Sequence, residues 1–176
     1  MPMRPGGPAV ATLAVLLLAA LPACAQSPAA GEANHDRPLK TKAVVDHVAD
    51  GDTIKVVVGG REEYVRFIGI DTPEVYGTPE CGGAQASASM KRLLEPGDKV
   101  KLIRDRSQGN VDVYDRLLRY VVRRGRDLGQ VQIKKGWARV YVYDRPFDRL
   151  SAYHRAQTKA RRADRGVWGL CGGFES

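Results

Sequence analysis

The segment from Arg66 to Glu74 reads RFIGIDTPE and places an apolar strand directly before a turn that carries two carboxylates. Pro73 has no amide hydrogen and a fixed φ, so a strand has to stop before it. We therefore expect Asp71 and Glu74 at the lip of a sheet, where carboxylates hold metal ions or face phosphates. The same residues also fit an ordinary strand followed by a capped turn. The rest of the chain has to decide between the two.

Residues 42–71 have the pattern of a three-stranded meander around that segment. Asp50-Gly51 lies between two apolar runs, which is a strong signal for a tight hairpin, and Gly59-Gly60 marks a second turn. Strands are expected from Ala43 to Val48, over 53–58 and over 64–70. Alternate strand ends of a meander share one edge of the sheet, so this pattern places Asp52 and Asp71 close together.

The remainder of the domain alternates further strand and helix patterns. Two more strands, three helices and a short extended piece are expected. The strands cover 99–103 and 116–122, the helices 84–95, 128–137 and 148–163, and the extended piece 140–143. Five strands in this order predict an α+β, mainly β domain over 40–172: a five-stranded OB-fold Greek-key barrel with three helices.

The charged residues of this domain predict a metal and phosphate site. Asp52 and Asp71 offer hard oxygen ligands without His or Cys, which favours Ca²⁺ or Mg²⁺, and carboxylates supplemented by carbonyls and waters favour Ca²⁺. Arg66 and Arg116 carry guanidinium forks that match phosphate oxygens in pairs. Either arginine taken singly fits a surface charge or a salt bridge to a local Asp better than a phosphate site, with Asp50 and Asp115 as the obvious partners.

Six segments together resemble the staphylococcal nuclease (thermonuclease) family over residues 42–170. The resemblance rests on three longer segments and three shorter ones, which occur in the family's order and spacing. They are GDTIKV from Gly51, RFIGIDTPE from Arg66, DVYDRLLRYV from Asp112, AQAS from Ala84, GWARVYVY from Gly136 and GVWG from Gly166.

The resemblance implies an OB-fold enzyme that uses Ca²⁺ to hydrolyse DNA and RNA and leaves 3′-phosphate ends. Each implied role falls on a residue that matches the family's motif. Asp52 and Asp71 match the carboxylate calcium ligands, Thr72 the residue that adds a carbonyl, Glu74 the glutamate assigned as general base, and Arg66 and Arg116 the phosphate-binding arginines.

Three tyrosines match residues that line the family's nucleotide pocket, and two nearby positions depart from the pattern. The tyrosines are Tyr114, Tyr141 and Tyr143. Asp115 stands where Gly is common before the arginine, and an Asp tolerates a left-handed turn better than most residues. Val113 replaces a basic residue, which weakens any contact with a terminal phosphate.

The first 24 residues read as an export signal. Arg4 supplies the positive start, and thirteen residues from Ala9 to Leu21 form an apolar core too short to span a bilayer. The segment 23–25 fits an A-x-A cleavage site that leaves Gln26 as the first residue, whereas the segment 21–24 resembles the lipobox of bacterial lipoproteins, in which Cys24 is lipidated. We favour the lipoprotein, because Cys24 otherwise has no role. Residues 25–39 read as a flexible linker. The domain is therefore expected outside the cytoplasm, secreted or lipid-anchored at the outer face of the membrane.

Two cysteines remain once Cys24 is set aside. In an oxidising compartment an even pair predicts a disulfide between Cys81 and Cys171, and two buried thiols are the alternative. No C-x-x-C motif occurs, which argues against zinc and redox sites.

The charge of the chain favours an anionic partner. It carries 28 Lys and Arg against 20 Asp and Glu, a net charge of +8, which suits nucleic acid, an anionic membrane or a wall polymer. We expect a monomer that acts on DNA and RNA, single-stranded or locally melted. Two other functions fit the chain: a non-catalytic OB module that binds nucleic acid, and a lipid-anchored wall or membrane adaptor.

Overall fold

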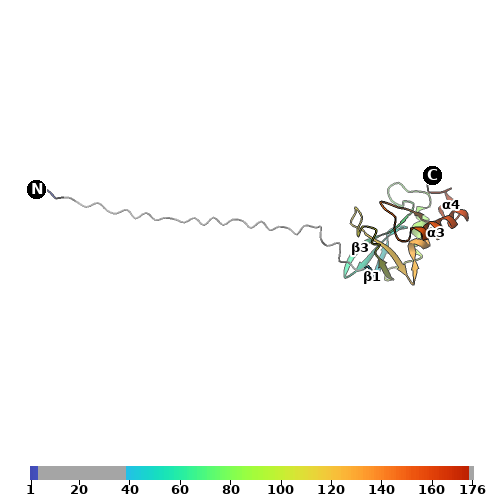
Figure 1. Ribbon diagram of the computed structural model, residues 1–176, viewed down its shortest axis with the longest axis horizontal. Coiled ribbons are helices and arrows are strands. Elements are labelled where there is room, and N and C mark those ends of the chain that lie inside the picture. Colours follow the sequence, from blue (N-terminus) through green and yellow to red (C-terminus); the bar gives the residue numbers. More distant parts are fainter. Residues whose placement is uncertain (4–38, 175–176) are drawn as a thin grey trace. The chain divides into compact units, whose positions relative to one another are not determined.

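The computed structural model describes residues 1–3 and 39–174. All its helices and strands lie between Lys40 and Leu170 (Figure 1). The expected signal peptide, the possible lipidation site Cys24 and nearly all of the linker lie outside the described residues. Within the described residues, no helix has the length and apolar character needed to cross a membrane.

Five strands close into a barrel, as predicted. They are β1 (Lys40–Val48), β2 (Thr53–Val58), β3 (Arg61–Phe67), β5 (Lys99–Ile103) and β6 (Leu117–Arg123), and the short β7 (Arg126–Asp127) extends the sheet. Neighbours pair antiparallel in the order β3-β2-β1-β5-β6-β7. Parallel pairing of β3 with β6 joins the two ends of the five-stranded set and closes the barrel.

The barrel interior is filled by the alternating apolar residues of these strands. Ile54, Val56 and Val65 are fully buried, and Phe67 is nearly so. Side chains of a strand alternate between the two faces, so the residues between them point outward or toward the rim. Polar residues such as Arg66 can therefore stand beside a buried core without entering it.

The three predicted helices are present, and residues 39–174 contain one further helix of a single turn. They are α1 (Gly83–Lys91), α2 (Leu128–Lys135), α3 (Leu150–Arg162) and the single-turn α4 (Val167–Leu170). Figure 1 shows α3 and α4 together on one side of the strands. The predicted helix 128–137 stops earlier because Gly136 has a φ of 77° and a Cβ there would lie 2.0 Å from the Arg165 carbonyl oxygen.

The third strand was predicted to run over 64–70 with Asp71 at its end. Its predicted C-terminal end is wrong, and the difference affects the position of Asp71. β3 stops at Phe67 because Gly69 adopts a φ of 76°, a left-handed conformation that glycine takes without strain. Any Cβ there would collide with the ring of Phe147 at 2.3 Å. After this turn, β4 (Ile70–Asp71) pairs instead with β8 (Arg139–Val140) in a separate ribbon.

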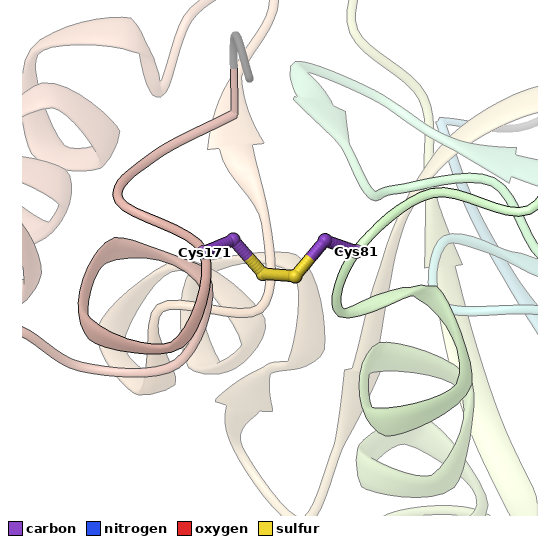
Figure 2. The surroundings of a disulfide bond; sticks show 2 residues. All are labelled: Cys81 and Cys171. Atoms are coloured by element: carbon purple, nitrogen blue, oxygen red, sulfur yellow. A yellow bond between two sulfur atoms is a disulfide. The ribbon is translucent and has the colours of Figure 1, made fainter.

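The predicted disulfide is present. It joins Cys81, in the loop before α1, to Cys171, directly after α4, with the two Cα atoms 6.0 Å apart (Figure 2). The bond spans 90 positions of sequence. It therefore ties the loop that follows Glu74 to the C-terminal end of the fold.

Candidate active site

A pocket of about 220 Å³ opens at the edge of the barrel where the first hairpin, the end of β4 and the start of β6 meet. Its walls bring together residues that lie far apart in the sequence. They are Asp50, Asp52, Thr53, Arg66, Thr72, Pro73, Glu74, Tyr114 and Arg116. Six of these are predicted site residues.

Asp52 is the most buried acid of the pocket, with 6% of its surface exposed. Its Oδ2 accepts hydrogen bonds from the amide (2.9 Å) and the hydroxyl (3.0 Å) of Thr72, and its Oδ1 from the hydroxyl of Thr53 at 3.1 Å. Burial raises the pKa of Asp52, Arg66 opposes that rise, and the carboxylate of Asp50 adds to it. The carboxylate is thus fixed in position by three hydrogen bonds, and its burial disfavours the ionised form.

Arg66 joins the two predicted metal-ligand carboxylates. Its Nη2 lies 3.2 Å from Asp52 Oδ2 and 3.2 Å from Asp71 Oδ1, and its Nη1 donates to the carbonyl of Ile70 at 2.8 Å. Asp71 is not among the residues that line the pocket, and its Oδ2 accepts from Nε and Nη2 of Arg139, both at 3.1 Å. Burial raises the pKa of Asp71, while Arg66 lowers it.

The backbone of Glu74 is fixed by hydrogen bonds to Glu80, whereas its side-chain carboxylate is available. Its amide donates to Glu80 Oε2 at 3.0 Å, and its carbonyl accepts from the amide of Glu80 at 2.9 Å. Its own carboxylate forms no hydrogen bond or ion pair with the residues that the structure describes. Partial desolvation raises the pKa of Glu74, and Asp52 and Asp71 raise it further. A free carboxylate with a raised pKa is suited to accept a proton.

Arg116 reaches the pocket from the turn before β6. Asp112 orients it: the side-chain Oδ2 accepts from Nε and Nη2, both at 2.7 Å. The Arg116 guanidinium also packs over the ring of Tyr114, 5.2 Å from its centre. Asp115, predicted to tolerate a left-handed turn, has a φ of 60°. The local salt bridge that the sequence left open for this arginine is present, but its partner is Asp112 and not Asp50 or Asp115.

Two residues of the site were missed by the sequence prediction. Asp50 appeared only as a salt-bridge partner, but it lines the pocket, and its Oδ1 accepts from the Asp52 amide at 2.9 Å. Gln132 of α2 is fully buried and donates to the carbonyl of Gly51 at 3.1 Å, directly beside Asp52. The signal for Gln132 was weak, because a lone glutamine in a helical pattern does not reveal which loop lies against it.

The three tyrosines predicted to line the nucleotide pocket do not all lie in the same pocket. Tyr114 lines the pocket beside Arg116. Tyr141 lies along a different pocket next to β8, and Tyr143 packs against Tyr141 with ring centres 6.4 Å apart. A nucleotide role for Tyr141 and Tyr143 stays a prediction, and Tyr141 lines the same pocket as Arg139 and not the pocket that contains Glu74.

The oxygen atoms near Arg66 fit a hard divalent cation in part. Oxygens of two carboxylates, Asp52 and Asp71, converge on one positively charged group, and Thr72 adjoins them. Within the described residues, no three or more His, Cys, Asp or Glu side chains form a cluster that could hold an ion. A cation here would take two carboxylates and complete its shell with carbonyl and water oxygens, which suits Ca²⁺ or Mg²⁺ and not a soft metal.

Comparison with known proteins identifies the family. The model of the staphylococcal nuclease homologue family matches residues 64–169. The thermonuclease of Staphylococcus hyicus is 34% identical over 127 residues, which is 70% of this chain and 73% of the relative. The chain belongs to the staphylococcal nuclease family.

Other staphylococcal nuclease relatives are longer than the part that matches. Endonuclease YncB of Bacillus subtilis is 33% identical over 73% of this chain, and the prophage-derived endonuclease YokF of the same organism is 34% identical over 70%. The match spans 62% and 43% of their lengths, respectively. The family membership predicted from six motifs is therefore confirmed, and so is the barrel that the family implied.

Proposed function

We propose that this protein is an endonuclease that hydrolyses phosphodiester bonds of DNA and RNA with the aid of Ca²⁺ and leaves 3′-phosphate ends. The observation that carries the proposal is the position of Arg66 and Arg116. Arg66 lies in β3 and Arg116 in the turn before β6, yet they line one pocket together with Asp52 and Glu74. Two guanidinium groups beside the free Glu74 carboxylate suit a phosphodiester and a water molecule.

Asp52, Asp71 and Thr72 would hold the metal ion. The geometry supports this assignment, since oxygens of both carboxylates meet at Arg66 Nη2 and Thr72 adjoins Asp52. Burial raises the pKa of both aspartates, so a cation beside them would favour their ionised forms. When bound there, a divalent cation offsets the negative charge of the phosphoryl oxygens.

The residues of the chain supply the remaining chemistry. The Glu74 carboxylate orients a water molecule and takes its proton as the water oxygen bonds to phosphorus. The bond from phosphorus to the 5′-oxygen breaks, which leaves the 3′-phosphate, and the departing 5′-oxygen takes a proton from solvent. Arg66 and Arg116 present fixed positive charge to the oxygens that become more negative in the transition state. Because guanidinium groups hardly lose their protons, the arginines act as electrostatic partners and not as the acid for the leaving oxygen.

The alternative is an OB module that binds nucleic acid without cutting it. A binder gains nothing from the free Glu74 carboxylate, which would repel a phosphate, whereas a hydrolase needs it. That difference favours the enzyme.

The proposed export and anchoring rest on the sequence of residues 1–24. We propose that the domain acts outside the cytoplasm, secreted or attached to the membrane through a lipid on Cys24. Incorporation of a labelled fatty acid into the parent chain, and its loss in Cys24→Ser, would support the anchor; incorporation that persists in the variant would refute it.

The activity is tested with the full chain and heat-denatured DNA, in Ca²⁺ and in EGTA. Degradation is expected in the presence of Ca²⁺ and not in EGTA. The 3′-phosphate ends of the products should make them resistant to a 3′-exonuclease until a phosphatase removes these phosphates. Glu74→Gln should abolish cleavage, and Glu95→Gln, an acid outside the pocket, should not. Cleavage that continues in EGTA contradicts the metal, and binding of DNA without cleavage by the parent supports the OB module instead.

A further inference from the structure

A second and larger pocket of about 590 Å³ is lined in part by Arg139, whose guanidinium contacts Asp71. Four parts of the fold enclose it: β8 and the residues after it, α3, α4, and the residues that follow Cys171. Its chemically distinctive wall residues are Arg139, Tyr141, Gln157, Arg161, Trp168 and Phe174. Its volume is in the range of pockets that hold small organic ligands.

Three polar side chains of this pocket, those of Arg139, Gln157 and Arg161, have hydrogen-bond donors that are not used within the described residues. Arg161 forms no ion pair with the residues that the structure describes, and its guanidinium lies over the Trp168 ring, 5.6 Å from the centre. Arg139 uses Nε and Nη2 on Asp71, which leaves Nη1 without a hydrogen bond in the described part of the chain. Gln157 accepts from the Val140 amide through Oε1, so its NH₂ group points elsewhere. Among the described residues that line this pocket there is no Asp or Glu. An anion would complete these donors.

The other walls are aromatic. Trp168 and Phe174 meet edge to face, with ring centres 4.9 Å apart. Tyr141 is 41% exposed and forms part of the same wall. Planar rings beside guanidinium groups are the combination that binds a base by stacking and its phosphate by charge.

One carboxylate connects this pocket to the candidate active site. Asp71 accepts from Arg139 through Oδ2 and from Arg66 through Oδ1. Arg66 lines the pocket proposed for the reacting phosphodiester, and Arg139 lines the second pocket. The two guanidinium groups are thus separated by a single side chain, a short span for successive phosphates of one strand.

We propose that this second pocket is a nucleotide subsite that binds the neighbouring phosphate and base of the same single strand whose phosphodiester occupies the active site. The proposal rests on the proposed nuclease function and specifies how that site holds its substrate. Arg161 and Arg139 bind the neighbouring phosphate, and the aromatic wall stacks with the base. The disulfide at Cys171 holds residues 172–174 beside the fold, and through them it completes the pocket.

The test compares substrates with one phosphate and with several. A dinucleoside monophosphate has only the phosphate that is cut, so it cannot reach Arg161 with a second one, whereas a tetranucleotide can. KM and kcat are measured for both substrates with the full chain, with Arg161→Ala and Phe174→Ala, and with Arg162→Ala as the matched control, which removes an exposed arginine next to Arg161 but outside the pocket. Thermal unfolding of each variant verifies that the fold is intact.

Arg161→Ala should raise KM for the tetranucleotide about tenfold, the effect of losing one charge-assisted contact, and change KM for the dinucleotide less than twofold. Phe174→Ala should raise the tetranucleotide KM roughly fivefold or more through lost stacking. Neither variant should change kcat more than twofold. In EGTA, with a labelled non-cleavable tetranucleotide, the slope of log K against log[salt] should fall by about 0.7 in Arg161→Ala.

The outcomes separate this proposal from the nuclease function. If the parent cleaves nucleic acid and Arg161→Ala behaves like Arg162→Ala toward both substrates, the subsite is refuted and the nuclease stands. If the parent cleaves neither substrate but the binding slope still depends on Arg161, the nuclease fails and the binding pocket stands. An equal rise in KM for both substrates also refutes the subsite, because it places Arg161 at the phosphate that is cut.

Discussion

The buried side chain of Gln132 gives the sharpest test of how the site is held in place. It is fully buried on α2, and its amide group makes three hydrogen bonds: to the Gly51 carbonyl (3.1 Å), to the Ala86 carbonyl (3.0 Å) and from the Ser89 hydroxyl (2.7 Å). Gln132→Leu keeps the bulk of the side chain and removes all three bonds. A buried polar group that loses its partner costs about 1–3 kcal/mol.

Taking the lower end of that range for each of the three groups, the free energy of unfolding should fall by about 3 kcal/mol. With a urea m-value of about 2 kcal/mol/M, the midpoint should move down by roughly 1.5 M. Because Gly51 precedes Asp52, activity should also fall at temperatures where the variant is fully folded, as the carboxylate loses its support.

Urea unfolding followed by circular dichroism measures the first effect, and cleavage of a labelled oligonucleotide at 15 °C measures the second. Gln130→Leu on the same helix is the control, since the Gln130 side chain makes no hydrogen bond in the described part of the fold. A midpoint within 0.3 M of the parent, or an equal loss in the control, would refute the reasoning.

Three further predictions concern other parts of the molecule. Reduction of the parent, or the pair Cys81→Ser and Cys171→Ser, should lower the free energy of unfolding by about 4–5 kcal/mol for a loop of 90 residues; an unchanged urea midpoint would contradict this. Glu74→Gln should reduce kcat about 10²- to 10⁴-fold with oligonucleotide binding retained, and a loss below tenfold in single-turnover cleavage would exclude Glu74 as the base. Burial alone would raise the pKa of Asp105, but hydrogen bonds from Tyr120, Ser107 and Asp148 lower it. A lowered pKa stabilises the fold at pH values above the unfolded pKa of about 3.9, and this contribution is lost as the pH falls through the lower native pKa. Below about pH 4 the free energy of unfolding of the parent should therefore fall more steeply with acid than that of Asp105→Asn. Urea titrations at several pH values measure this, and parallel pH curves for the two proteins would refute it.

Much of the fold followed from local signals. The pairs Asp50-Gly51 and Gly59-Gly60 predicted the two hairpin turns. The strand predicted over 53–58 has the same first and last residues as β2. These features depend on the backbone preferences of a few adjacent residues, which the sequence displays directly.

The chain path after Phe67 did not follow from local signals. Continuous apolar residues through Ile70 looked like one strand, and the left-handed turn at Gly69 became visible only with Phe147 packed against it. That turn pairs Asp71 with Arg139 of β8, a contact over 68 positions that no periodicity predicts.

The sequence by itself determined the barrel, the disulfide and the set of charged residues, because turn chemistry, alternation and cysteine number act locally or by count. Only the tertiary structure decided how those charges are shared. It placed Asp71 between Arg66 and Arg139, brought Gln132 under Gly51, and moved Tyr141 into a second pocket. Such arrangements arise from packing between distant segments, where a few ångströms decide which donor meets which acceptor.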